Sequence, residues 1–162
     1  MISTRIFPLT SLLMTAAIFG FFYAWVCSTM WGLDAADPAV AIKAMQAMNA
    51  SVRNAVFFPA FFLTPVVLAI TAGLLVRSGG RGAAIWFALA ASVYLAGGLG
   101  VTVIVNVPMN EALALAAVPE TAEAANQLWQ AYSGRWQDWN QIRTAASGLS
   151  VVLTGFGLLK IT

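Results

Sequence analysis

The chain has 162 residues, of which 60% are hydrophobic and only 9% charged, and its mean hydropathy is +0.83. A soluble domain carries about 25% charged residues, so these values exclude a water-soluble globule and predict an integral membrane protein. The net charge of +2 without a basic run gives no indication of nucleic-acid binding. The sequence has one Cys and no His, which excludes an intramolecular disulfide and removes the commonest general base, the usual haem ligand and most zinc sites.

Four apolar segments are long enough for a helix that crosses a hydrocarbon core of about 30 Å, which takes roughly 20 residues. They lie at about residues 9–31, 55–76, 83–105 and 142–159. The first is too long for the apolar core of a signal peptide, about 7–15 residues, so we expect it to be retained as a helix. We therefore predict an all-α integral membrane four-helix bundle, a single domain over residues 1–162, with short helices in its two longer loops.

The loop between the first two segments, residues 34–54, contains a predicted helix that begins at Asp37 and Pro38. Gln46, Asn49 and Arg53 recur at helical spacing and share one face of it. A polar face of an interfacial helix in contact with water explains this pattern. A row of ligand-binding side chains explains it equally well.

The second segment contains Pro59 and Pro65, which we expect to kink its helix and to free the carbonyl groups of Ala55 and Phe61. Residues 77–82, "RSGGRG", then form a tight link to the third segment, which predicts an antiparallel pair of helices.

The distribution of charge predicts the orientation in the membrane. All six acids lie on the side of the two long loops, whereas the opposite side carries only basic residues: Arg5, Arg77, Arg81 and Lys160. By the positive-inside rule, both termini are expected in the cytoplasm and the long loops outside it. In a bacterium the membrane would be the inner one.

The third segment ends in "TVIVNVPMNEAL", residues 102–113. Pro108 predicts that the helix ends near Val105, since proline interrupts a helix and disfavours helical geometry in the residue before it. Asn106 would then cap the end of this helix, and Asn110 would cap the start of the next. Two carboxamides on a rigid Val-Pro-Met bridge also suit the wall of a ligand site, and both interpretations stay open.

The segment that leads into the fourth span, "WQAYSGRWQDWNQIRTAAS", places Trp136, Asn140 and Arg143 at helical spacing, with Trp139 beside them. An aromatic belt at the headgroup level accounts for the tryptophans, but an arginine near the membrane needs a partner or a wet cavity. Together with the polar residues of the two loops, these side chains predict a largely apolar pocket with a few convergent polar groups at the outer end of the bundle. Its predicted members are Gln46, Asn49, Arg53, Asn106, Asn110, Trp136, Asn140 and Arg143.

A metal site is poorly supported. Thioethers are soft ligands that suit Cu(I), but methionines without Cys or His nearby are more often packing residues. The methionines in these loops and their flanks are Met30, Met45, Met48 and Met109. We expect neither a metal nor a cofactor.

Four motifs occur in order between residues 19 and 144, within a resemblance that covers nearly the whole chain: "FGFFYAWVCSTMWGL" at 19–33, "AMQAMN" at 44–49 followed by Arg53, "VNVPMN" at 105–110, and W-x-x-W-N-x-x-R-T at 136–144. In these motifs the chain resembles the anthrone oxygenases, a family of small four-helix membrane proteins. The resemblance implies cofactor-independent chemistry, in which a phenolic anthrone loses a proton and its carbanion reacts with O₂ to give a quinone. It also implies that five residues of this chain belong to the residue pattern of the family: Asn106, Asn110, Trp136, Asn140 and Arg143.

Two functions therefore remain. In the first, an apolar phenolic or quinone-like molecule enters from the bilayer and lies against Trp136 and Trp139. Its developing oxyanion accepts hydrogen bonds from Asn106, Asn140 and Arg143, and Glu111 or Asp138 takes the proton. In the second, the same pocket belongs to a non-catalytic module that binds a lipid, a quinone or a partner protein. The two differ in whether the carboxylates point into the pocket, and a monomer and a homo-oligomer are both compatible with the sequence.

Overall fold

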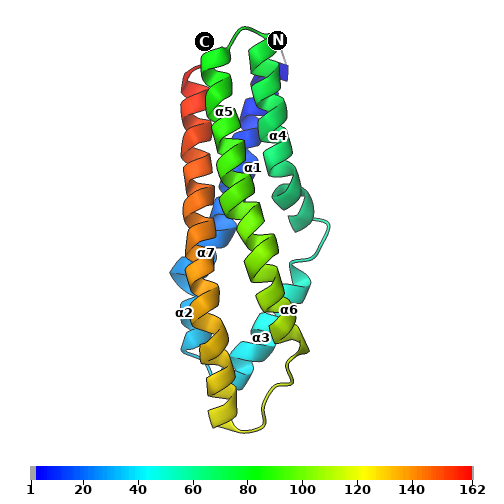
Figure 1. The fold of residues 1–162 in the computed structure, drawn as a ribbon, viewed down its shortest axis with the longest axis vertical. Helices are drawn as coiled ribbons and strands as arrows, with labels where there is room; N and C mark the ends of the chain where they lie inside the picture. Colours follow the sequence, from blue (N-terminus) through cyan, green and yellow to red (C-terminus); the bar gives the residue numbers. More distant parts are fainter. Residues whose placement is uncertain (1–2, 162) are drawn as a thin grey trace.

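The computed structural model describes residues 3–161, which contain helices and no strands (Figure 1). The side chain of Arg5, one of the basic residues used for the orientation, lies outside the described part. Four helical stretches are long and apolar enough to cross a membrane: Ile6–Asp34, Phe57–Arg77, Arg81–Leu115 and Ala122–Leu159. The predicted all-α fold with four candidate membrane spans is confirmed.

The first stretch consists of α1 (Ser3–Ala24), the π-helical segment η1 (Trp25–Thr29) and α2 (Met30–Asp34). The loop that follows contains α3 (Pro38–Ser51). Its start agrees with the prediction, since one carboxylate oxygen of Asp37 accepts hydrogen bonds from the backbone N–H groups of Ala39 and Val40, at 2.9 and 3.2 Å. Pro38 occupies the first turn, where its missing N–H has no cost.

The helix α4 (Phe57–Arg77) contains Pro65, which lacks the N–H that would otherwise bond to the carbonyl of Phe61. The hydroxyl of Tyr94, from the next helix, donates to this carbonyl at 2.8 Å. The predicted free carbonyl is therefore satisfied by a neighbouring helix, and the contact ties α4 to η2.

The third helical stretch does not end near Val105, and the prediction was wrong in this respect. It runs through α5 (Arg81–Val93), the π-helical segments η2 (Tyr94–Gly100) and η3 (Thr102–Asn106), and α6 (Val107–Leu115). The N–H of Val107 bonds to the carbonyl of Thr102, five residues back, and Pro108 falls in the first turn of α6, where proline is tolerated. The wider π-helical turns thus carry the helix past the proline. Asn106 makes no capping hydrogen bond and Asn110 lies inside α6, so the two predicted caps do not form.

The fourth helix, α7 (Ala122–Leu159), is also longer than predicted. It has 38 residues and at 1.5 Å per residue is about 57 Å long, which exceeds a hydrocarbon core of about 30 Å. Between α6 and α7 only residues 116–121 remain outside helices. The polar first half of α7 is helical because its other face is buried against α2, α3 and α6.

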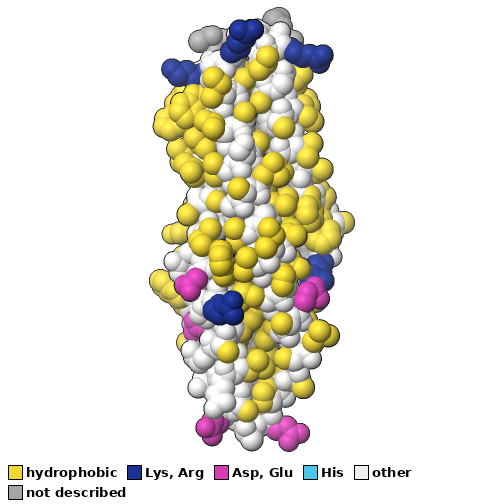
Figure 2. Space-filling view, in the orientation of Figure 1, with side chains coloured by type: hydrophobic (Ala, Val, Ile, Leu, Met, Phe, Trp, Pro, Cys, Tyr) yellow, Lys and Arg dark blue, Asp and Glu magenta, His cyan; other side chains and the backbone are white. Residues whose placement is uncertain are grey.

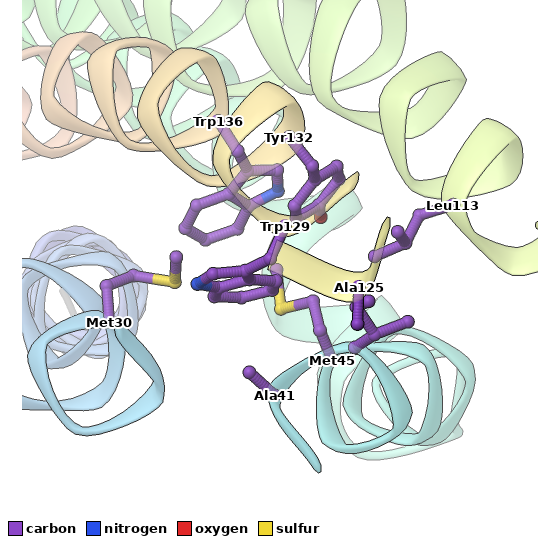
Figure 3. Close-up of a cluster of buried hydrophobic side chains, with 9 residues drawn as sticks. Met30, Ala41, Met45, Leu113, Ala125, Trp129, Tyr132 and Trp136 are labelled. Carbon is purple, nitrogen blue, oxygen red and sulfur yellow. The ribbon is translucent and has the colours of Figure 1, made fainter. Parts of the chain in front are cut away.

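Figure 3 shows this buried face, in which Trp129 lies among the side chains of Met30 and Met45. These methionines therefore contribute to packing. The whole cluster is formed by Met30, Ala41, Ile42, Met45, Leu113, Ala125, Trp129, Tyr132 and Trp136.

Within the candidate spans, α1 and α5 each pack against both α4 and α7. Small residues allow close approach: a Cβ at Gly97 would clash with the Cβ of Ala146, and the hydroxyl of Ser150 donates to the carbonyl of Ala90 at 3.0 Å. Helices in lipid commonly associate through such small residues.

The two chain ends and the α4–α5 link lie at one end of the molecule, and α3 and α6 lie toward the other (Figure 1). On the face in Figure 2, Lys and Arg cluster at the end with the termini, and a band without charged side chains separates them from the mixed charges of the other half. This pattern is the one expected of a protein that crosses a bilayer at the uncharged band.

Candidate functional site

A cavity of about 350 Å³ lies where α1, α3, α4, η3, α6 and α7 converge. Its size falls at the lower end of the range of small-molecule sites, about 300–1,000 Å³. Eight of the lining residues are aromatic: Phe21, Phe22, Trp25, Phe57, Phe58, Phe61, Phe62 and Trp136. The polar and charged lining consists of Asn49, Arg53, Thr102, Asn110, Glu111 and Arg143.

Arg143 is the charged group at the buried side of this cavity, with 4% of its surface exposed. Its guanidinium carbon lies 4.6 Å from the ring centroid of Phe22 and 5.0 Å from that of Trp136. One terminal nitrogen donates to the side-chain oxygen of Asn140 at 2.8 Å, and the other to the hydroxyl of Thr102 at 3.4 Å. The cation is thus held between two aromatic faces by neutral acceptors.

Within the part of the chain that the structure describes, no carboxylate pairs with Arg143. The one ion pair among residues 6–161 joins Arg53 and Glu111. A buried charge without a partner is costly, and the Nε of Arg143 also has no hydrogen-bond acceptor within the described protein. An anionic group in the cavity would supply the missing charge and the missing acceptor.

Asn140 holds Arg143 in place rather than lining the cavity. It is buried, its side-chain N–H donates to the backbone carbonyl of Phe22 at 3.2 Å, and its oxygen accepts from Arg143. Both ends of the carboxamide are therefore engaged, and Asn140 links the arginine on α7 to the backbone of α1.

A second network orients Trp136. The side-chain oxygen of Asn110 accepts from the indole N–H of Trp136 at 2.9 Å and from the hydroxyl of Tyr132 at 2.8 Å. Asn49 donates to the same hydroxyl at 3.4 Å. Residues from α3, α6 and α7 thereby fix the indole that lies against Arg143.

Asn106 is fully buried, and neither atom of its carboxamide has a partner within the described protein. Thr102 and Asn110, four residues to either side of it, both hydrogen-bond to α7, so Asn106 belongs to the stretch of η3 and α6 that packs against α7. It does not line the cavity. Buried polar groups are nearly always hydrogen-bonded. The carboxamide of Asn106 is therefore an unusual, unsatisfied polar side chain behind the cavity wall.

Arg53 and Glu111 form an ion pair at the outer edge of the cavity, between the end of α3 and α6. The side chains are 48% and 50% exposed, so the pair borders water. Among the residues that the structure describes, Glu111 is thus the one carboxylate in the lining, and it is already engaged by a cation.

Three predicted site residues lie elsewhere. The amide nitrogen of Gln46 donates to the carbonyls of Leu113 and Ala116, at 2.8 and 3.0 Å, and so caps the end of α6. Asp138 is exposed, Trp139 is half-buried, and neither lines the cavity. The structure therefore brings Asn49, Arg53, Asn110, Glu111, Trp136 and Arg143 together in one wall, with Asn140 and Asn106 behind it.

The sequence analysis missed the phenylalanine wall. Phe57 and Phe61 are stacked with 5.3 Å between ring centroids, and Phe21 lies 4.7 Å from Phe57. The signal was present in "FFPAFF", residues 57–62, where two pairs of phenylalanines recur four apart. In an apolar membrane helix this pattern is hidden, because phenylalanine also suits contact with lipid.

Comparison with known families agrees with this architecture. A family model described as anthrone oxygenase matches residues 47–153, which is more than half of the chain. The chain belongs to the anthrone oxygenase family. The matched residues include the cavity-lining parts of α4, α6 and α7, and the resemblance seen in the sequence motifs is confirmed. No curated protein and no solved structure matches the chain.

Proposed function

We propose that this member of the anthrone oxygenase family is a membrane-embedded oxygenase that oxidises an apolar phenolic molecule of the anthrone type, or a related quinone-like molecule, with O₂ and without a cofactor. The observation that carries the proposal is Arg143: a buried cation that has no carboxylate partner among the described residues and lies between aromatic faces, in a cavity of suitable size. Such a site favours a flat aromatic molecule that becomes an anion.

The first step is loss of a proton from the CH₂ group of the substrate. The resulting negative charge is delocalised onto the ring carbonyl oxygen, where Arg143 stabilises it in a site with little water. Asn140 positions the guanidinium for this role. Glu111, the carboxylate in the lining, is the proposed proton acceptor, with Arg53 moving aside as Glu111 becomes neutral.

The second step uses O₂ as the oxidant. The carbanion transfers an electron to O₂, and the two radicals combine to form a C–O bond and a peroxide, which is protonated. Loss of the second proton from the same carbon, with cleavage of the O–O bond and departure of hydroxide, gives the carbonyl. The balance at this carbon is CH₂ + O₂ → C=O + H₂O.

The alternative function is a non-catalytic module that binds a lipid, a quinone or a partner protein at the same cavity. The pairing of Glu111 with Arg53 and the exposure of Asp138 favour this reading, because no free carboxylate of the described residues then lines the cavity. Binding without turnover would be its signature.

We also propose that the protein resides in a cell membrane, in a bacterium the inner one, with both termini in the cytoplasm and the α3 and α6 end outside. The charge-free band and the basic end with the termini support this orientation (Figure 2). The ligand and the surrounding lipid are the proposed partners, and a homo-oligomer stays compatible with the bundle.

The test is oxidation of an anthrone by the purified protein in lipid nanodiscs under ¹⁸O₂, with empty nanodiscs to measure spontaneous oxidation. We expect one ¹⁸O atom in the new carbonyl and a rate in the Arg143→Met variant that is lower by roughly 10²–10³-fold, the effect of removing one oxyanion donor. Asp138→Asn, a change outside the cavity, serves as the control and should retain the rate. Binding of the anthrone with no rate above that of empty nanodiscs would overturn the oxygenase in favour of the binding module.

A further inference from the structure

The cavity wall formed by α4 and η3 is at the same time part of the outer surface of the protein. Phe58, Phe62 and Val103 line the cavity, and they are 41%, 44% and 47% exposed. A side chain that borders both the cavity and the exterior lies at an opening. All three are apolar, in contrast to the ion pair of Arg53 and Glu111 at the outer edge.

This opening exists because two helices separate. Near the α4–α5 link these helices pack side by side, whereas no Cα of α4 lies within 8 Å of any Cα in η3 or α6, all of which the structure describes. Figure 1 shows the start of α4 apart from α6. The π-helical segments η2 and η3 lie where the helix leaves α4, and such segments commonly redirect a helix.

The opening lies within the candidate membrane spans Phe57–Arg77 and Arg81–Leu115. The exposed neighbours on the same two helices are apolar as well, among them Leu63, Val66 and Ile104. Side chains of this kind are stable at the surface when they contact lipid. The opening therefore faces the bilayer, whereas the edge with Arg53 and Glu111 faces water.

We propose that Phe58, Phe62 and Val103 form a lateral portal through which the ligand passes between the bilayer and the cavity, while the Arg53–Glu111 pair closes the aqueous side. This inference rests on the proposed function and narrows its substrate class. The substrate is an uncharged, planar, fused-ring molecule that partitions into lipid, and it becomes an anion only after it reaches Arg143. Molecules with a permanent charge or a sugar group are excluded, because they do not cross an apolar portal.

The portal is tested by the rate of ligand binding, independently of turnover. Dihydroxyanthraquinone, dissolved in donor vesicles, is mixed with the protein in nanodiscs, and its arrival is followed by quenching of tryptophan fluorescence, to which Trp25 and Trp136 in the cavity wall contribute. Val103→Phe narrows the portal, and Ile104→Phe is the matched control, since Ile104 is 75% exposed and lies outside the lining. Phe62→Ala widens the portal, with Leu63→Ala as its control.

We expect Val103→Phe to slow both binding and release by roughly tenfold while the affinity stays nearly constant, because an obstruction raises the barrier in both directions. Phe62→Ala should accelerate both, and the two control variants should match the wild type. An anthraquinone sulfonate should not quench the wild-type protein.

Rates that are equal in Val103→Phe and Ile104→Phe, or rapid binding of the sulfonate, would overturn the portal. So would failure of the neutral anthraquinone to bind the wild type. Portal-dependent binding without ¹⁸O incorporation would instead overturn the oxygenase and leave the portal intact, so the two proposals fail in different ways.

Discussion

The guanidinium of Arg143 on α7 lies over the ring of Phe22 on α1, 4.6 Å from its centroid, and Asn140 bonds to both residues: it accepts from the arginine and donates to the backbone carbonyl of Phe22. One carboxamide therefore links the two helices through a buried cation. Cation–aromatic contacts are worth about 2 kcal/mol or more when desolvated, which offsets part of the cost of burying the charge. An anionic ligand in the cavity would offset the remaining cost of burying this charge.

Replacement of Asn140 by Asp separates folding from ligand binding. The new carboxylate would pair with Arg143 and supply the missing counter-charge inside the protein, so we expect the Asn140→Asp variant to fold. It should unfold no faster than Asn140→Leu, a variant that removes the polar contact to Arg143 without adding a charge. It should nevertheless bind a hydroxyanthraquinone, which enters neutral and ionises beside Arg143, roughly tenfold more weakly, since the cation is already neutralised; tenfold corresponds to about 1.4 kcal/mol. Isothermal titration in detergent measures this, and an affinity equal to the wild type would contradict the anion-binding role.

The hydrogen bond from Tyr94 to the carbonyl of Phe61 depends on Pro65. In Pro65→Ala the backbone N–H of residue 65 becomes available for this carbonyl, so the hydroxyl of Tyr94 is no longer required. We expect Tyr94→Phe to lower the free energy of unfolding by about 1–2 kcal/mol in the wild type, the cost of a buried unsatisfied carbonyl, and by much less in Pro65→Ala. Unfolding in mixed micelles provides the measurement, and equal losses in both backgrounds would show that the proline is not the cause.

The close approach of η2 and α7 at Gly97 predicts a second pair of compensating changes. A Cβ at Gly97 would overlap with that of Ala146, so Gly97→Ala should destabilise the protein by about 1–3 kcal/mol through overpacking. Ala146→Gly in the same chain should restore most of the loss. Gly155→Ala is the control, because a Cβ there meets nothing within 4 Å. If the double variant is no more stable than Gly97→Ala alone, the clash is not between these two residues.

Much of the fold could be predicted from local chemistry. Apolar segments long enough for a bilayer located the four candidate spans, and Asp37 with Pro38 located the start of α3, because capping and hydropathy depend on few neighbouring residues. Pro108 misled the prediction for the same reason. Its local effect is to end a helix, but the π-helical turns of η3 absorb it, and no local rule anticipates them.

The candidate site could be predicted only in part. Arg143, Asn110 and Trp136 stood out because polar and indole side chains at a membrane boundary need partners. Gln46 matched the same pattern, yet its partners are the carbonyls at the end of α6, since α6 extends to meet α3. The phenylalanine wall could not be told from a lipid-facing surface, because the direction of each ring depends on how α1 and α4 pack together.

The most direct test of the account is the ionisation of a hydroxyanthraquinone bound in the cavity, followed by the change in its visible absorption with pH. A neighbouring cation favours the ionised form and lowers the pKa of a phenol. We predict that the bound dye ionises at least about one pH unit lower with the wild-type protein than with Arg143→Met, a difference of about 1.4 kcal/mol. Equal ionisation in the two proteins, with the dye bound in both, would show that Arg143 does not stabilise an anion there, and the central claim would be wrong.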